Sequence, residues 1–236
     1  MTLAVRDTAL RELMDDPHCD PARLDATLRR FGTVNRLVSG WGHVYRRRLR
    51  PHLAALGRPA RVLDLGSGGG DVVTRLAGLA RRDGLRVDWL GVDPDPRALA
   101  MAERRVATNV HFRCADSTGL LAEGATFDAV VSNHVLHHLT PDELHRFTAE
   151  SLALSTGPVL HGDIARDRVA FGLYAIGITP IAPGTFLRTD GLRSIRRSYR
   201  ADELQHALAA AGHNGNGWRV ESHPPFRLLA HATGHA

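Results

Sequence analysis

The chain has 236 residues, a formal net charge of +5 and a sequence pI of about 10.1, and this length fits one α/β domain with additions. All 30 of its basic residues are Arg, and they are spread along the chain, so we interpret the charge as a compositional bias and expect no nucleic-acid partner. The sequence has no run of about 18 apolar residues and no signal-peptide pattern, and Cys19 and Cys114 lie far apart. These features exclude a membrane span, a disulfide framework and a cysteine-based zinc site, and they predict a cytoplasmic protein without a membrane partner.

The first part of the chain, residues 1–57, has apolar residues at helical spacing in ARLDATLRRFGTVNRLVSGW and HVYRRRLRPHLAAL. The pattern predicts helices that are interrupted near Gly40 and Gly42. Amphipathic helices need an apolar surface to cover, so we expect this part to form a helical cap or lid over a pocket in the rest of the chain.

From Arg61 onward, short apolar runs alternate with amphipathic stretches, which is typical of parallel βαβ units with both faces of the sheet covered. Residues 58–236 are therefore expected to form one α/β domain. The stretch 166–197 interrupts the alternation with mixed apolar, Gly and Pro residues, and we expect it to be an insertion that forms part of a substrate wall. A helix is predicted near residues 199–212, and WRVESHPPFRLLAHA predicts a final pair of strands.

The segment DLGSGGGD joins the first predicted strand to a helix and is suited to hold a ligand, although a plain structural turn has the same appearance. The dinucleotide pattern GxGxxG fails here, because Asp71 stands where its third Gly belongs. Asp64, two residues before Gly66, would be unfavourable beside a pyrophosphate. The same carboxylate favours a ligand that carries an ammonium group.

Two further acids follow the next two predicted strands. Asp93 lies where a carboxylate can accept hydrogen bonds from ribose hydroxyls, and Asp116 lies where it can meet an adenine amino group. Each acid alone is more often an ordinary turn residue. Together with Asp64 in register, they favour a site for a nucleoside.

These residues resemble the class I S-adenosylmethionine-dependent methyltransferases through LDLGSGGGD, GVDPDP, CADS and FDAVVSNHVLHHLTPDEL, over about positions 58–165. The resemblance implies a doubly wound, Rossmann-like sheet of seven strands, parallel except for a reversed C-terminal strand. It also implies S-adenosylmethionine as the cofactor, over the carboxyl ends of the first strands, and the acceptor over the fourth and fifth. The implied cofactor-binding residues are Asp64, Gly66, Ser67, Gly68, Gly70, Asp93, Pro94, Asp116, Ser117, Asn133 and His134.

The segment NHVLHHLTPDEL contains the start of a helix. Thr140 is a good N-cap, Pro141 suits the first helical position and Glu143 completes a capping box. Residues 133–139 are then a loop above the fourth strand. A histidine in this loop can act as a general base, although most of the loop histidines are expected only to pack or to hydrogen-bond.

Similar small-molecule O-methyltransferases use a His from an LHH loop with an Asp after the next strand, and this resemblance implies His137 as the base and Asp163 as its partner. His138 and His161 are held in reserve for the same role. No nearby carboxylate–His spacing marks a closed metal site, so no metal is expected.

The later segment RTDGLRSIRRSYRADEL resembles bacterial methyltransferases of natural-product pathways, and FGLYAIGITPIAPGTF favours an apolar acceptor. The expected reaction is methyl transfer to a hydroxyl of a small phenolic or polyketide-type molecule in secondary metabolism, by a monomer or a homodimer. The alternatives are C-methylation of a quinone-like or aromatic ring, methylation of RNA, and a non-catalytic cofactor-binding protein. Residues proposed to contact the acceptor are Trp41, His161, Arg196 and Tyr199.

Overall fold

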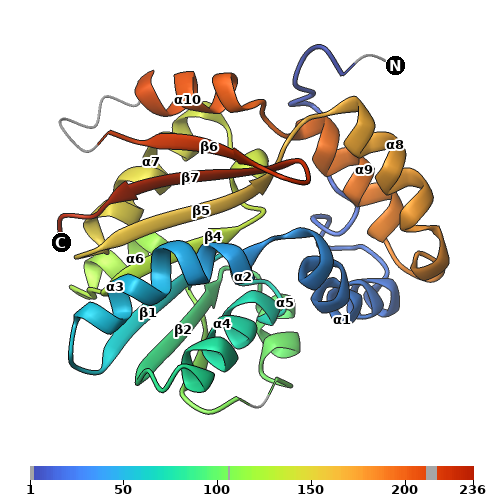
Figure 1. The fold of residues 1–236 in the computed structure, drawn as a ribbon. Helices are drawn as coiled ribbons and strands as arrows, with labels where there is room; N and C mark the ends of the chain where they lie inside the picture. The colour runs from blue at the N-terminus through green and yellow to red at the C-terminus, as the bar shows by residue number, and fades with distance from the viewer. Residues whose placement is uncertain (1–2, 106, 211–216) are drawn as a thin grey trace.

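The structure, a computed structural model, describes residues 3–105, 107–210 and 217–236 around a seven-stranded sheet in the order β3-β2-β1-β4-β5-β7-β6 (Figure 1). The first five strands pair in parallel, and β7 runs antiparallel to both β5 and β6. The predicted Rossmann-like sheet with a reversed C-terminal strand is thus confirmed. The strands are β1 (Ala60–Leu65), β2 (Val87–Asp93), β3 (Val110–Cys114), β4 (Ala129–Asn133), β5 (Pro158–Ile164), β6 (Arg219–His223) and β7 (Arg227–Thr233).

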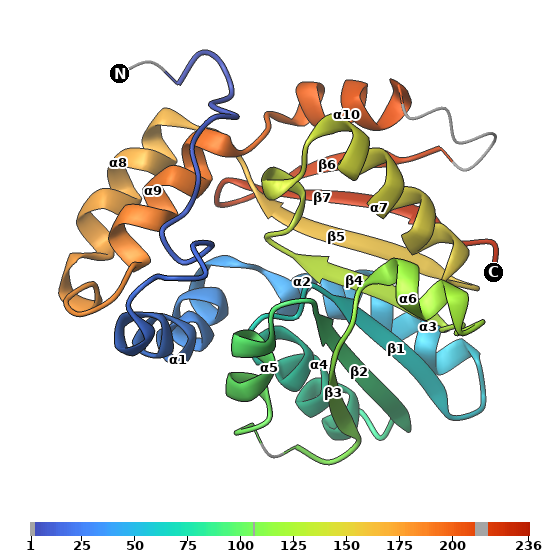
Figure 2. The same cartoon turned by 180° about the vertical axis from the view of Figure 1, so that it is seen from behind.

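Helices cover both faces of the sheet and make three layers (Figures 1 and 2). The central strands are apolar on both sides for this reason: in β1, Val62 packs into one core cluster, while Leu63 and Leu65 pack into the other. One face carries α2 (Trp41–Val44), η1 (Tyr45–Leu49), α3 (Arg50–Ala55) and α4 (Asp71–Arg82), and the other carries α6 (Ser117–Ala122), α7 (Pro141–Ala153) and α10 (Ala201–Ala210).

Two predicted helix boundaries can be compared with the structure. Thr140 and Glu143 form the expected capping box at the start of α7, because each accepts a hydrogen bond from the other's backbone amide. Gly40 interrupts the N-terminal helices with a φ of 69°, which favours glycine. Gly42 does not interrupt them, because it lies inside the continuous helical segment that runs through α2, η1 and α3. The expected helix near 199–212 is observed as α10, and its last residues lie outside the described part of the chain.

A second group of helices gathers beyond the carboxyl ends of the parallel strands (Figures 1 and 2). Residues 3–20, here called the N-terminal strap, run along this group and are not helical. Asp190 anchors the strap, because its carboxylate accepts hydrogen bonds from the amides of Leu13 (2.8 Å) and Met14 (3.0 Å). The group comprises α1 (Pro21–Val38), α8 (Arg168–Gly177), η3 (Thr179–Ile181) and α9 (Leu187–Arg197), with α5 (Pro96–Ala102) beside α1.

The N-terminal region therefore contains two structurally different parts. Leu49 and Leu53, 0% and 3% exposed, belong to the same core cluster as Val62 of β1, so residues 41–55 are part of the sheet's covering layer. The strap and α1 lie at the edge of the sheet instead. A cap over residues 1–57 stays a prediction, and the residues of this region that line the cavity all come before Gly40. None of the helices in the described ranges is long and apolar enough to cross a membrane.

Candidate active site

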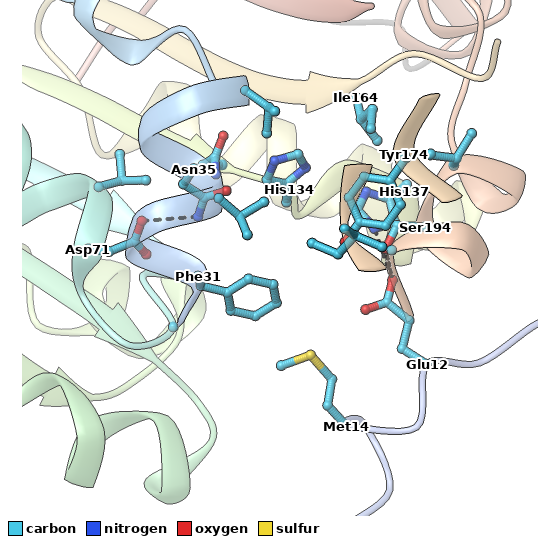
Figure 3. A pocket seen from close by; sticks show the side chains of 18 of the residues that line it. Glu12, Met14, Phe31, Asn35, Asp71, His134, His137, Ile164, Tyr174 and Ser194 are labelled. Atoms are coloured by element: carbon cyan, nitrogen blue, oxygen red, sulfur yellow. Dashed lines mark hydrogen bonds and ion pairs between the residues drawn. The ribbon is translucent and has the colours of Figure 1, made fainter. Parts of the chain in front are cut away.

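A cavity of about 500 Å³ lies between the sheet edge and the second group of helices (Figure 3). At one end it meets the glycine-rich turn after β1, and at the other it meets the strap, α9 and the loop after β4. Its walls between these ends are mostly apolar. Wall residues include Phe31, Val34, Val38, Ile164, Leu173, Tyr174, Ile178 and Phe226.

The glycine-rich turn forms the floor of the first end. Gly68 has a φ of 52°, and a Cβ built on it would meet nothing within 4 Å, so this position leaves open space beside the backbone. Its amide donates a hydrogen bond to the Asp93 carboxylate (2.9 Å), which therefore fixes the shape of the turn. Gly66, Ser67 and Gly68 line the cavity as predicted.

Asp64 lies at the same end, in β1, and is only 1% exposed. Among the described residues, neither of its carboxylate oxygens has a hydrogen-bond partner of good geometry. Burial raises the pKa of Asp64 well above its usual range, the carboxylates of Asp71 and Asp93 raise it further, and the Val73 amide opposes them only weakly. A buried carboxylate without a good hydrogen-bond partner favours a ligand with a positively charged donor.

The β4 end supplies the middle of the cavity. Asn133 and His134 line it, and the Asn133 carboxamide oxygen accepts a hydrogen bond from the Trp41 indole (2.9 Å). Asn35 of α1 also lines the cavity and donates to Asp71 (3.0 Å), as Figure 3 shows. Helix α1 is thereby tied to the start of α4.

At the other end, the structure brings together the histidine and carboxylate that the resemblance implies. His137 lies in η2 (Leu136–His138), and its Nδ1 is 2.7 Å from Asp163, at the end of β5. The amide of His137 also donates to Asp163 (3.0 Å). The other ring nitrogen, Nε2, lies 3.3 Å from Glu12 of the strap, which Ser194 of α9 also contacts (Figure 3).

The charges in this network are strongly coupled. Burial would lower the pKa of His137, but the carboxylates of Asp163 and Glu12 outweigh it and raise this pKa to about 9. Burial would raise the pKa of Glu12, but the hydrogen bond and charge of His137 lower it to about 2. Both carboxylates therefore favour the protonated form of the His137 ring. His137 as the general base stays a prediction, and it requires that Glu12 leave Nε2, the nitrogen that would face an acceptor.

His138 follows in the same turn and also lines the cavity. Its Nε2 lies 3.6 Å from the same Glu12 oxygen, and its Nδ1 lies 3.4 Å from Asp15 of the strap. The strap thus presents a carboxylate to both neighbouring histidines. The contact between Glu12 and His137 joins residues that are 125 positions apart in the sequence.

Several residues implied as cofactor contacts lie outside the cavity lining. Asp93 lies at the sheet edge with its carboxylate turned to the amides of Gly68 and Asp95. Asp116 caps α6 by accepting from Gly119, and Ser117 contacts Glu150 of α7. In the turn, Gly69 lines the cavity where Gly70 was expected. The residues outside the lining are Gly70, Asp93, Pro94, Asp116 and Ser117.

None of the four residues proposed for acceptor contact lines the cavity. His161 is fully buried between β4 and the C-terminal strands, where its Nδ1 meets Ser132 (2.7 Å) and its ring stacks on Trp218. Burial lowers its pKa to about 3, so it is a neutral core residue and no reserve base. Trp41 is 1% exposed behind Asn133. The other two hold the strap: Arg196 pairs with Asp7, and Tyr199 lies beneath the Arg6 guanidinium.

The sequence interpretation missed the residues that approach from the strap and α1. Glu12, Asp15 and Asn35 line the cavity, yet each lies in a segment with no motif. An acidic residue in an N-terminal amphipathic stretch is usually solvated, so the sequence alone offers no signal for them.

Part of this sequence is similar to known proteins. Residues 62–155 match the family described as methyltransferase domain. A ubiquinone biosynthesis O-methyltransferase of Rhizobium johnstonii is 27% identical over 157 residues, and one of Rhizobium etli is 28% identical over the same length. Each match covers 64% of this chain, and the chain spans 59% of the length of these relatives.

Solved structures share the fold at low identity. The plantazolicin methyltransferase BamL, solved with a triazolic desmethylPZN analog and SAH, has a TM-score of 0.65 at 13% identity, over 89% of this chain and 90% of that one. A SAM-dependent methyltransferase of Aquifex aeolicus has a TM-score of 0.57 at 16% identity, covering 91% and 98%. Magnesium protoporphyrin IX methyltransferase of Synechocystis, with bound SAH, has a TM-score of 0.52 at 16% identity, covering 84% of each chain.

Proposed function

We propose that this chain is a class I S-adenosylmethionine-dependent methyltransferase that transfers the methyl group to a hydroxyl of a small, largely apolar molecule. One observation carries the proposal. A single cavity joins a glycine-rich turn with an unpaired buried carboxylate to a cluster of histidines and carboxylates, with apolar walls between them. A donor and an acceptor can be aligned only if both fit one cavity.

The turn end suits S-adenosylmethionine. Asp64 would accept the ammonium group of the methionyl part, because its buried oxygens have no other partner within the described ranges. The open space beside Gly68 lets a ligand approach the backbone closely, and the apolar wall can take the nucleoside. When bound, this cofactor supplies a methyl group on a sulfonium. Hydrogen bonds from the ribose hydroxyls to the Asp93 carboxylate, which also accepts from the Gly68 amide, stay a prediction.

The remaining part of the cavity suits the acceptor. Phe31, Ile164 and Tyr174 face one another across it, and a ring or an acyl chain would be buried between them (Figure 3). Among the described residues that line the cavity beyond the cofactor end, strongly polar side chains gather around Glu12, His137, His138 and Ser194. A hydroxyl is therefore expected to point to that cluster, with the apolar body behind it. Phenolic and polyketide-type molecules have this form.

The polar cluster also gives the hydroxyl proton a destination. Asp163 interacts with both the backbone amide and Nδ1 of His137, which fixes the orientation of the ring toward the acceptor. For His137 itself to take the proton, its Nε2 must first be deprotonated, and the acceptor oxygen must replace Glu12 there. Alignment over a short distance provides most of the rate in this scheme, and the proton-accepting group adds about 10²–10⁴-fold.

The relatives' names support oxygen as the methylated atom, since both are named O-methyltransferases. The experiment uses the full chain with S-adenosylmethionine radiolabelled in the methyl group, offered phenols, polyketide-like hydroxyls, quinones and RNA in parallel. Label on a phenolic or polyketide oxygen is expected. Label on a ring carbon or on RNA would replace the proposal by C-methylation or RNA methylation. Cofactor binding without transfer to any pool would leave a binding protein.

A further inference from the structure

We propose that Glu12, His137 and His138 bind a divalent transition-metal cation at the acceptor end of the cavity. Metal binding is a property of the chain that stands apart from the proposed function. Its part in catalysis rests on that function, because the cation would face the acceptor hydroxyl.

The positions of the three side chains fit an ion between them. One Glu12 oxygen, Oε1, lies 3.3 Å from Nε2 of His137 and 3.6 Å from Nε2 of His138. All three ligand atoms lie within 4.8 Å of one another. Metal bonds of about 2.0–2.2 Å in a tetrahedron separate ligand atoms by about 3.3–3.6 Å. Small side-chain adjustments, with release of the Nε2 proton of His137 as the cation binds, would therefore complete the site.

The far nitrogens of both rings support the same assignment. Nδ1 of His137 is 2.7 Å from Asp163, and Nδ1 of His138 is 3.4 Å from Asp15. Metal-bound imidazoles almost always donate their other N–H to a carboxylate, a carbonyl or water, which fixes the ring and its tautomer. Two neighbouring histidines here have a carboxylate behind Nδ1 and share a carboxylate in front of Nε2. A simple His–Glu ion pair would need only one histidine and one carboxylate, without a second carboxylate behind each ring.

The charge and the ligand types indicate the class of ion. Glu12, Asp15 and Asp163 place three carboxylates around two imidazoles. Arg197 forms an ion pair with Asp15 at 3.6 Å. Two imidazoles and one carboxylate suit Zn²⁺, Fe²⁺ or Mn²⁺, whereas Mg²⁺ and Ca²⁺ prefer oxygen ligands. A second group, His134, His137 and Asp163, shares His137 but uses the Asp163 carboxylate that already holds that ring.

Three protein ligands leave coordination positions free, and all three ligands line the cavity. An acceptor hydroxyl bound there would have a lowered pKa, because the cation stabilises the deprotonated oxygen. The proton would leave to water, the new O–C bond would form as the S–C bond of the cofactor breaks, and the sulfonium would become a neutral thioether. His137 would then hold the ion, and no histidine would need to act as the base.

The experiment is a zinc titration of the purified full chain after treatment with a chelator. Calorimetry and metal analysis are expected to show one equivalent of tightly bound Zn²⁺, and Co²⁺ in its place is expected to give the intense visible absorption of a tetrahedral site. Glu12→Gln, which keeps the shape of the side chain, and His138→Ala, at a half-buried position, should each weaken binding at least tenfold. His111→Ala, at an exposed position, is the matched control and should bind as the wild type does.

Zinc held equally by all four proteins would be adventitious binding to surface histidines and would overturn the inference, as would no binding by the wild type. Circular dichroism and thermal unfolding of each variant exclude loss of the fold as the cause of weaker binding. S-adenosylmethionine affinity and methyl transfer are measured on the same samples. Normal methyl transfer without zinc binding would overturn the metal site and leave the proposed function intact. Zinc binding without cofactor binding would support the metal site and contradict the proposed function.

Discussion

Replacing Asp64 by asparagine tests the cofactor end of the cavity with a change of one charge and almost no change of shape. The wild-type carboxylate is 1% exposed and, in the part of the chain described, has no good hydrogen-bond partner. It therefore obtains its favourable interactions from the bound ligand. Asp64→Asn should weaken S-adenosylmethionine binding while leaving the fold in place.

The magnitude follows from the loss of one hydrogen bond to a charged group, which contributes about 1.5–3 kcal/mol. This corresponds to an increase in Kd of about 10- to 150-fold. The free protein should respond in the opposite direction. Burial and the nearby Asp71 and Asp93 disfavour the ionised form of Asp64, so the neutral amide should leave the unliganded protein at least as stable as the wild type.

Isothermal titration with S-adenosylmethionine measures the affinity, and thermal unfolding without ligand measures the stability. Asp88→Asn, at an exposed position in β2, is the control and should change neither quantity. Two results would refute the reasoning: wild-type affinity in Asp64→Asn, or a large loss of stability in its unliganded form. The second would mean that the carboxylate serves the fold.

Three further predictions concern other parts of the account. Asp93→Ala should weaken cofactor binding by about 1–3 kcal/mol, because the amide of Gly68 loses its acceptor; calorimetry showing unchanged affinity would remove Asp93 from the site. Deleting residues 1–19 should leave a folded protein that still binds the cofactor but turns over the acceptor poorly, and kinetics at wild-type level would exclude the strap from the acceptor site. The pKa of His161 is about 3 in the folded state, below its usual 6.5, so protonation favours unfolding and stability is lost as pH falls from 6.5 towards 3. His161→Phe should lose less stability over this range, and urea unfolding curves parallel to the wild type at every pH would contradict it.

The sheet could be predicted because its signals are local. Apolar runs separated by amphipathic stretches predicted the five parallel strands, and the run PDEL after Thr140 predicted the capping box of α7. The pairing of His137 with Asp163 followed from the resemblance and from the rule that neighbouring parallel strands end at the same edge of a sheet.

The other half of the site could not be predicted, because it depends on how distant segments pack. Glu12 reaches His137 because residues far along the chain, among them Asp190 of α9, hold the strap in place, and no local pattern records such an approach. His161 and Asp163 lie on the same strand two residues apart, yet Trp218 and Phe147 bury the first while the second meets the loop. Alternation along a strand gives the side of the sheet but not what covers each position.

A crystal structure of the full chain with S-adenosylhomocysteine and a phenolic acceptor would test the central claim most directly, because that claim is an arrangement of two ligands in one cavity. We predict the amino group of the cofactor product within hydrogen-bonding distance of Asp64, and the acceptor hydroxyl beside Glu12, His137 and His138, in line with the sulfur. A nucleoside bound away from the glycine-rich turn, or an acceptor hydroxyl pointing away from the histidines, would contradict the account.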